Sequence, residues 1–73
     1  MAKHKYKTVT IARIKIGSII KLDRWYGTCL FKVDDVRHDE NFTQISCSNI
    51  NITNVPQEVF TASNSSEYRM MVN

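Results

Sequence analysis

Hydrophobic and polar residues alternate over most of the first 53 positions of this chain, which is the pattern of β-strands. In the first such run Val9 and Ile11 occupy odd positions, whereas Ile14 and Ile16 continue the pattern on even positions. Residues two apart on a strand face the same side of a sheet. This change of phase therefore predicts a bulge or bend at residues 12 and 13.

The central part of the sequence contains both glycines and the only tryptophan. Gly17 and Ser18 predict a sharp bend, because glycine lets the backbone turn steeply into a following strand. Beyond it we expect a strand over residues 19–22, an aromatic loop over 23–27 and a long strand over 28–37. Within that strand Val33 and Val36 fall on different faces, so a second bulge is expected between them, near residues 34 and 35.

The next segments predict a polar turn over residues 38–41, a strand over 43–47, a turn at 48 and 49, and a last short strand over 50–53. No segment keeps a helical period for more than two turns. Short, closely spaced strands with bends and bulges indicate an all-β fold. We therefore predict one β core domain over residues 6–53, built as a small SH3-like barrel or a strongly bent antiparallel sheet of four to five strands.

Both ends of the chain differ from this core. Residues 1–5 are polar, and we expect a flexible N-terminus. Residues 54–73 contain the only proline and a Ser/Asn cluster at 63–66, and their apolar residues follow no sustained period. This composition predicts a disordered, flexible C-terminal tail, with a helical turn around residues 57–60. Alternatively, the tail orders when it binds a partner.

A chain of 73 residues is long enough for one domain, and a domain of this size has a small core. The basic start is not followed by an apolar run, so we expect no signal peptide and a cytoplasmic location. In a reducing compartment Cys29 and Cys47 are expected to remain free thiols and to act as small apolar core residues. Their spacing does not fit a zinc site, and no apolar run is long enough to span a membrane.

Charge is unevenly distributed. Residues 1–32 carry eight Lys or Arg and one acid, whereas residues 33–73 carry two Lys or Arg and six acids. The basic half suits a polyanion or an acidic protein surface. Several cations at odd positions are expected to form a stripe along the first strand that suits phosphate contacts: Lys3, Lys5, Lys7, Arg13 and Lys15. The alternative is that these lysines protect a sheet edge from pairing with other chains.

Residue types that could carry catalysis are present but poorly arranged. Asp34 and Asp35 are adjacent, and neighbours on a strand point to opposite faces. His38 precedes Asp39 in a predicted turn, with no nucleophile near it in the sequence. No phosphate-binding, metalloprotease or nucleophile-elbow motif is present. We therefore expect a non-enzymatic protein without cofactor or metal.

The aromatic loop is the strongest binding candidate. Arg24, Trp25 and Tyr26 have the composition of an interface hot spot, and in a nucleic-acid reader the same side chains stack on bases. The alternative is that Trp25 folds back as a lid on the core. Of the two aromatic residues, Tyr26 is expected to be the more exposed.

One resemblance rests on the run TVTIARIKIGSIIKLDRWYGTCLFKVDDV and on the change of character at Thr53 and Asn54. In this layout the chain resembles the small transcription regulators of lytic bacteriophages, such as the RNA-polymerase-binding regulator of a Xanthomonas phage. The resemblance implies a non-catalytic inhibitor of transcription initiation that binds host RNA polymerase near the N-terminus of its largest subunit. It also implies interference with the σ factor, and antitermination.

The residues predict a monomeric binding protein, and the resemblance implies that it is a phage regulator that binds host bacterial RNA polymerase. The alternative is a small basic SH3-like or OB-like nucleic-acid-binding module. The residues expected to contact the partner are Arg13, Lys15, Arg24, Trp25, Tyr26, Glu58 and Phe60.

Overall fold

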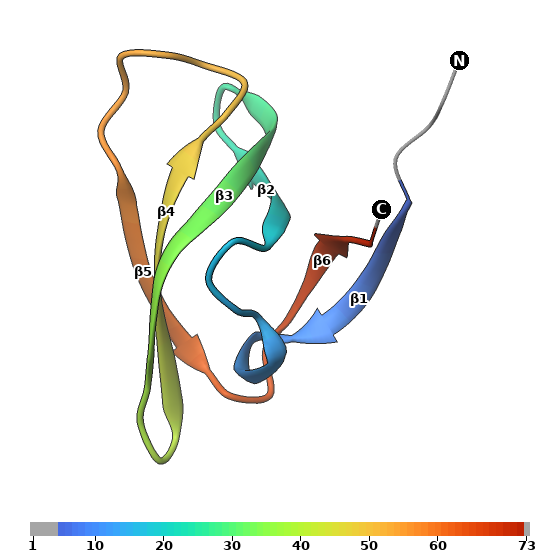
Figure 1. The fold of residues 1–73 in the computed structure, drawn as a ribbon, viewed down its shortest axis with the longest axis vertical. Coiled ribbons are helices and arrows are strands. Elements are labelled where there is room, and N and C mark those ends of the chain that lie inside the picture. The colour runs from blue at the N-terminus through green and yellow to red at the C-terminus, as the bar shows by residue number, and fades with distance from the viewer. Residues whose placement is uncertain (1–4, 73) are drawn as a thin grey trace.

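The fold, taken from a computed structural model that describes residues 5–72, is a single antiparallel sheet of six strands (Figure 1). The elements are β1 (Tyr6–Thr10), the 3-10 turn η1 (Ile11–Arg13), β2 (Ile19–Arg24), β3 (Gly27–His38), β4 (Phe42–Asn49), β5 (Glu58–Ser63) and β6 (Glu67–Met71). The strand order is β1-β6-β2-β3-β4-β5. The predicted all-β class is confirmed, in its form as a strongly bent sheet, with six strands instead of four to five.

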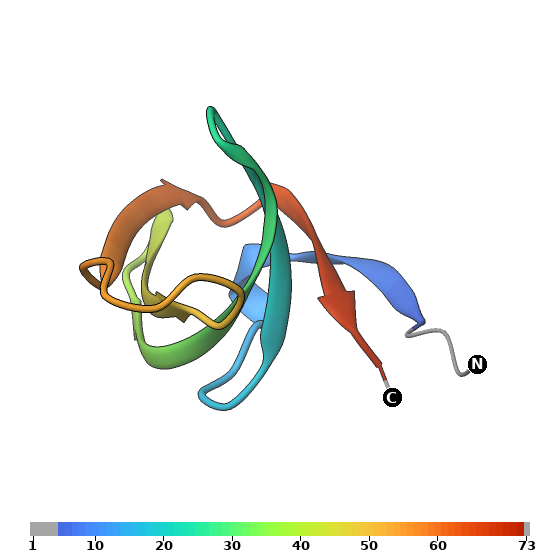
Figure 2. The same cartoon turned by 90° about the horizontal axis from the view of Figure 1, so that it is seen from above.

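The sheet is curled but not closed into a barrel. Seen from above, β3, β4 and β5 curve around one side of β2, while β1 and β6 extend away on the other (Figure 2). β1 and β5 are the two ends of the strand order and do not pair with each other. The inner face of the curl holds the core, with these residues buried: Val9, Ile11, Ile14, Ile20, Leu22, Cys29, Phe31, Val33, Ile45 and Cys47.

Both predicted irregularities are present. The register of β3 against β4 shifts between Val33 and Asp35, so that Val33 faces Cys47 and Val36 faces Ile45. This bulge lets both valines point toward the core although they are three residues apart. At the first phase change η1 turns the chain, and the N–H of Ile14 donates to the carbonyl of Ile11 at 3.1 Å.

The bend at Gly17 is also confirmed. Gly17 has a φ of +92°, a conformation that residues with a side chain rarely adopt. Its N–H donates to the carbonyl of Val33 at 2.8 Å, which fixes the bend against β3.

The predicted flexible tail is wrong for most of its length. β5 pairs with β4 along six residues, and β6 pairs with β1 along five. β6 also pairs with β2, so it is an interior strand of the sheet. Phe60 and Ala62 of β5, and Tyr68 and Met70 of β6, pack against the core from alternate positions. The β core therefore does not end at residue 53.

Two smaller predictions are also wrong. Residues 50–53 form bends and not a strand, because the Asn49 side-chain oxygen accepts hydrogen bonds from the N–H groups of Asn51 (2.8 Å) and Ile52 (3.0 Å) and turns the chain. The helical turn expected at 57–60 is the start of β5. The predicted flexible N-terminus lies outside the described residues except for Lys5, whose carbonyl accepts a hydrogen bond from the N–H of Val72 at 2.9 Å.

The two cysteines are buried on β3 and β4, as predicted, and both are free thiols. Burial raises the pKa of the Cys47 thiol to about 11; nearby Glu58 adds to this rise and Arg24 opposes it. At neutral pH the Cys47 thiol is therefore protonated and is a poor nucleophile.

Candidate functional site

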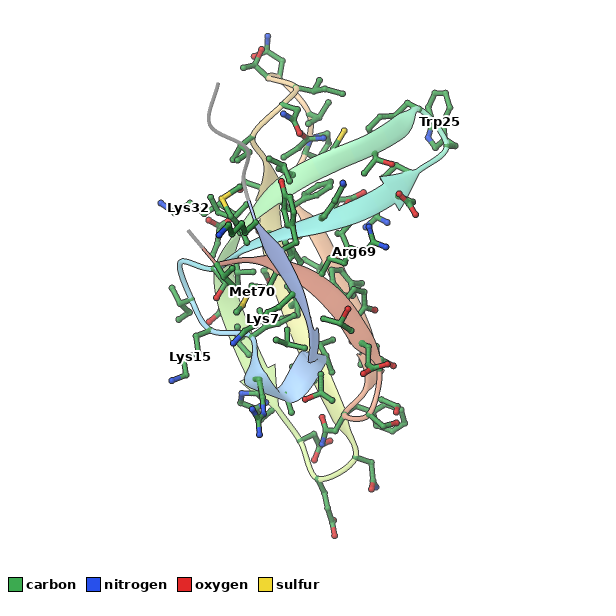
Figure 3. All side chains as sticks on the ribbon, turned by 90° about the vertical axis from the view of Figure 1, so that its right-hand side faces the viewer. Lys7, Lys15, Trp25, Lys32, Arg69 and Met70 are labelled. Carbon is green, nitrogen blue, oxygen red and sulfur yellow. The ribbon has the colours of Figure 1, made fainter. Side chains whose placement is uncertain are left out.

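The aromatic residues lie at the tip of the β2–β3 hairpin. Arg24 pairs with Gly27, so Trp25 and Tyr26 form the two-residue turn between the strands. Gly27 has a φ of +124°, which returns the chain into β3. The two rings contact edge to face, with centroids 5.3 Å apart. Trp25 extends from the hairpin end, away from the body of the molecule (Figure 3).

The exposure of the two rings is the reverse of the prediction. Trp25 is 95% exposed, whereas Tyr26 is 39% exposed. The idea that Trp25 covers the core is therefore wrong. The hairpin extends past the last buried residues of its strands, Leu22 and Cys29, so a side chain at its tip has no core within reach.

A recess lies beside the tip, between the hairpin and the connection that joins β4 to β5. Its volume is about 460 Å³, and the surface that lines it is mostly apolar. The ring of Phe31 contributes to its floor, and three exposed residues of the connection form its far side: Ile52, Val55 and Pro56. We call Trp25, Tyr26, Ile52, Val55 and Pro56 the hairpin-tip surface.

The connection is held in place by hydrogen bonds to β3. The N–H of Ile50 donates to the carbonyl of Leu30 at 2.9 Å, and the N–H of Leu30 donates to the Asn51 side chain. Asp34 accepts hydrogen bonds from the hydroxyl of Ser48 and, at 2.9 Å, from the side-chain amide of Gln57. These two donors, Ser48 first, lower the pKa of the Asp34 carboxyl. Both walls of the recess are thus tied to the same strand.

Arg24 and Glu58 form an ion pair at the edge of the recess. Nε of Arg24 donates to Oε1 (3.0 Å) and Oε2 (2.9 Å) of Glu58, and a terminal nitrogen lies 2.8 Å from Oε2. The guanidinium group also lies over the ring of Phe31, 5.5 Å from its centroid. The hydrogen bond to Glu58 raises the pKa of Arg24 above its usual value. The pair joins β2 to β5, which are not neighbours in the sheet, and so fixes the curl beside the hairpin.

We expect Glu58→Gln to lower the free energy of unfolding by about 1 kcal/mol, because it removes the charge from a pair that is only partly exposed to water. Urea unfolding at neutral pH measures this change. Glu67→Gln is the matched control, since Glu67 is exposed and neutralising it should shift stability by less than about 0.5 kcal/mol. Equal effects of the two substitutions would contradict a stabilising role for the pair.

A second group of predicted residues lies in a different part of the molecule. Lys7 of β1, Arg13 at the end of η1 and Lys15 in the following loop line a hollow of about 490 Å³. Val9, Ala12, Ser18 and Met70 complete the lining, which contains no acidic residue. We call this hollow the basic groove. Figure 3 shows Lys7, Lys15 and Met70 near one another and Trp25 far from them. Lys3, the first residue of the predicted stripe, lies outside the described residues.

The predicted contact residues therefore form two groups, and one residue lies apart from both. Arg24, Trp25, Tyr26 and Glu58 meet at the hairpin tip, although Arg24 and Glu58 bind each other. Arg13 and Lys15 meet in the basic groove. Phe60 is half-buried against the core, with its ring 5.6 Å from that of Tyr68. Its contact with a partner stays a prediction, as do the other roles.

Sequence reasoning missed three residues of the hairpin-tip surface: Ile52, Val55 and Pro56. The sequence pattern predicts a strand at Ile52 and a flexible tail at the other two residues. The sequence feature that could have identified these surface residues is a set of apolar side chains in a segment with many Asn and Thr. Such residues, when they lie outside an alternating pattern, often remain at the surface.

The candidate catalytic groups do not converge. Asp35 pairs weakly with Arg37 at 3.6 Å, and His38 contacts the hydroxyl of Thr43 at 3.1 Å. Within residues 5–72, no three metal-ligating side chains gather into a potential metal site. Over the same residues no helix is long and apolar enough to cross a membrane.

Comparison with known proteins identifies no relative. The sequence matches no protein-family profile and no curated protein, and no solved structure matches the chain.

Proposed function

We propose that this protein is a non-catalytic phage regulator that binds host bacterial RNA polymerase through the hairpin-tip surface and inhibits transcription initiation. The observation that carries the proposal is Trp25, which is 95% exposed beside an apolar recess. A tryptophan in this position contributes almost no core packing. Buried by a partner, its side chain removes about 200 Å² from water, which corresponds to several kcal/mol of binding energy at roughly 25 cal/mol per Å².

The geometry of the tip favours a protein partner. The recess accepts a side chain of the partner next to Trp25, while Tyr26 and Asn49 supply polar groups at its edge. Interface hot spots combine an aromatic anchor, a pocket and a polar rim in this way. Because both walls are tied to β3, little backbone entropy is lost when a partner binds.

The choice of RNA polymerase rests on the resemblance of the run over residues 8–36 to small phage regulators. On that basis the hairpin-tip surface docks near the N-terminus of the largest subunit, where a bound domain interferes with the hold of the σ factor. The same contact, kept during elongation, is compatible with antitermination. No covalent chemistry is needed, because occupation of the surface is itself the inhibitory event.

A pull-down from bacterial lysate tests the proposal. The full-length protein is used as bait, the lysate is treated with nuclease, and the beads are washed at low salt and at about 0.3 M salt. An aromatic, apolar contact loses little affinity over this range, whereas a contact with nucleic-acid phosphates loses much of it. We expect the subunits of RNA polymerase to remain bound. If the polymerase is absent after nuclease treatment, the proposal is wrong.

A further inference from the structure

The basic groove is a patch of positive charge with no acidic residue in its own lining. Lys7, Arg13 and Lys15 line it, and none of them makes a hydrogen bond, ion pair or ring contact with its side chain to another described residue. Each of the three residues is exposed. Cations gathered without counter-charges repel one another, so an anion that enters the groove meets a favourable potential.

The acidic residues of the chain are mostly elsewhere. Asp34 and Glu58 are bonded near the hairpin-tip surface, and Asp39 and Glu40 lie at the turn between β3 and β4. Glu67 borders an adjacent hollow together with Lys7 and Arg13. The field of the groove is therefore positive, and Glu67 weakens it from one side.

The backbone that carries Arg13 and Lys15 is fixed by its neighbours. Ile11 and Ile14 are completely buried or nearly so, at 0% and 1% exposure, and they anchor the turn from inside. The N–H of Ile11 donates to the carbonyl of Ser66 at 2.7 Å, and the N–H of Ser18 donates to the carbonyl of Lys15 at 3.0 Å. Burial of the two isoleucines forces the residues beside them outward, so the cations are preorganised.

Further cations lie outside the groove. On the outer face Lys21 of β2 lies directly opposite Arg69 of β6. Like charges at opposed positions of an antiparallel pair destabilise the sheet. Lys32 lies on the outer face of β3, opposite Ile19. These side chains do not line the groove, and Lys21 and Arg69 share a separate hollow with Asp23 and Glu67. The basic groove, in contrast, has three cations and no acid in its lining, which suits an extended polyanion better than a single ion.

We propose that the basic groove binds the phosphodiester backbone of a nucleic acid without regard to sequence, on a surface separate from the hairpin tip. Lys7, Arg13 and Lys15 each contact a phosphate. The groove offers no aromatic ring and no set of polar groups that could read a base edge, so affinity comes from charge. Met70 and Val9 form an apolar floor against which sugars can lie. This proposal does not depend on RNA polymerase as a partner.

Fluorescence anisotropy with the full-length protein tests the proposal, using labelled oligothymidylate and a mixed-sequence DNA duplex as probes. Three phosphate contacts predict a slope of log affinity against log salt of about −2 for the single strand and nearly −3 for the duplex. The same relation predicts a loss of about fivefold per removed contact near 0.1 M salt, and thus roughly 25-fold for the double variant Arg13→Gln/Lys15→Gln.

Matched variants separate the groove from net charge. Arg37→Gln removes one charge beside the β3–β4 turn and should change affinity by no more than about twofold, compared with about fivefold for Arg13→Gln alone. Arg13→Lys/Lys15→Arg keeps the charges and should bind nearly as well as the unmodified protein. Glu67→Gln should strengthen binding. Circular dichroism establishes that each variant is folded.

Three outcomes would overturn the proposal. The first is the absence of binding to either probe at about 0.05 M salt, where three phosphate contacts are strongest. The second is an equal loss of affinity in Arg13→Gln and in Arg37→Gln, because this result would indicate a diffuse effect of net charge. The third is binding to vesicles of anionic phospholipid but to neither oligonucleotide. Binding to one or both probes with the predicted order of variants supports it.

Discussion

Deletion of residues 54–73 is expected to abolish cooperative folding. β1 pairs with no strand except β6, so the deletion removes its whole ladder of hydrogen bonds. It also separates β1 and η1 from β2, since β6 lies between them. Val9 and Ile11, which are buried, then lose the strand that holds them over the core.

The expected loss exceeds what a chain of this size can tolerate. Four apolar side chains of the deleted segment pack against the core: Phe60, Ala62, Tyr68 and Met70. The three large ones contribute about 1.5 to 3 kcal/mol each when fully buried, and somewhat less here because they are half-buried. A domain of about 70 residues has a total stability of only about 4 to 10 kcal/mol. The truncated chain should therefore populate mainly unfolded states at room temperature.

Urea unfolding followed by circular dichroism, together with amide resonance dispersion in NMR spectra, measures this effect. Truncation after Val72 is the control, because it removes none of the described residues and keeps the bond from Val72 to Lys5. A truncated chain that ends at Thr53 and still unfolds cooperatively at the same urea concentration would show that β5 and β6 do not stabilise the sheet.

Local alternation explains why much of the fold could be predicted. In a strand with one buried face, every second residue faces the core and is apolar, and β2, β3 and β4 each follow this rule. The bulge at Asp34 could be predicted because the apolar positions change from odd to even numbers between Val33 and Val36. These features depend on residues close together in the sequence, so they can be recognised without knowing which strands are neighbours.

The last two strands could not be recognised in this way. β5 and β6 are short, their core-facing residues are only half-buried, and β6 pairs with strands that lie about 50 to 65 residues earlier in the chain. The composition of the Ser/Asn cluster between them favours disorder. Asn64 in fact accepts a hydrogen bond from the buried hydroxyl of Thr43 at 2.6 Å and donates to the carbonyls of Asp39 and Glu40. Composition does not distinguish a polar residue that bonds to a buried group from a polar residue in a disordered loop.

The candidate sites show the same limit. The local segment predicts a loop over residues 23–27 that contains Trp25 and Tyr26, but the distance of these two residues from the core depends on hairpin length and sheet curvature. Arg24 and Glu58 were both identified as contact residues, and no local pattern indicates that they meet across 34 positions. The recess could not be predicted because its two walls come from segments that are brought together only by the folded sheet.

Replacement of Trp25 by alanine is the substitution with the largest expected effect on function. At 95% exposure the indole contacts little besides Tyr26, so its removal should change the free energy of unfolding by less than about 0.5 kcal/mol. If Trp25 is the anchor of the interface, the loss of binding energy should reach about 2 kcal/mol or more. That corresponds to at least about a 30-fold weaker affinity for RNA polymerase.

Binding of the labelled protein to purified RNA polymerase, measured at about 0.3 M salt to suppress charge effects, tests this expectation. Phe42→Ala is the matched control, since it removes a 49% exposed aromatic side chain beside the β3–β4 turn, at the other end of the molecule (Figure 1). Trp25→Phe should retain part of the affinity, because a smaller ring still fills some of the contact. Unchanged affinity of Trp25→Ala, with Phe42→Ala also unchanged, would rule out the hairpin tip as the anchor. Loss of affinity in both variants would instead indicate an interface that extends along the outside of the whole sheet.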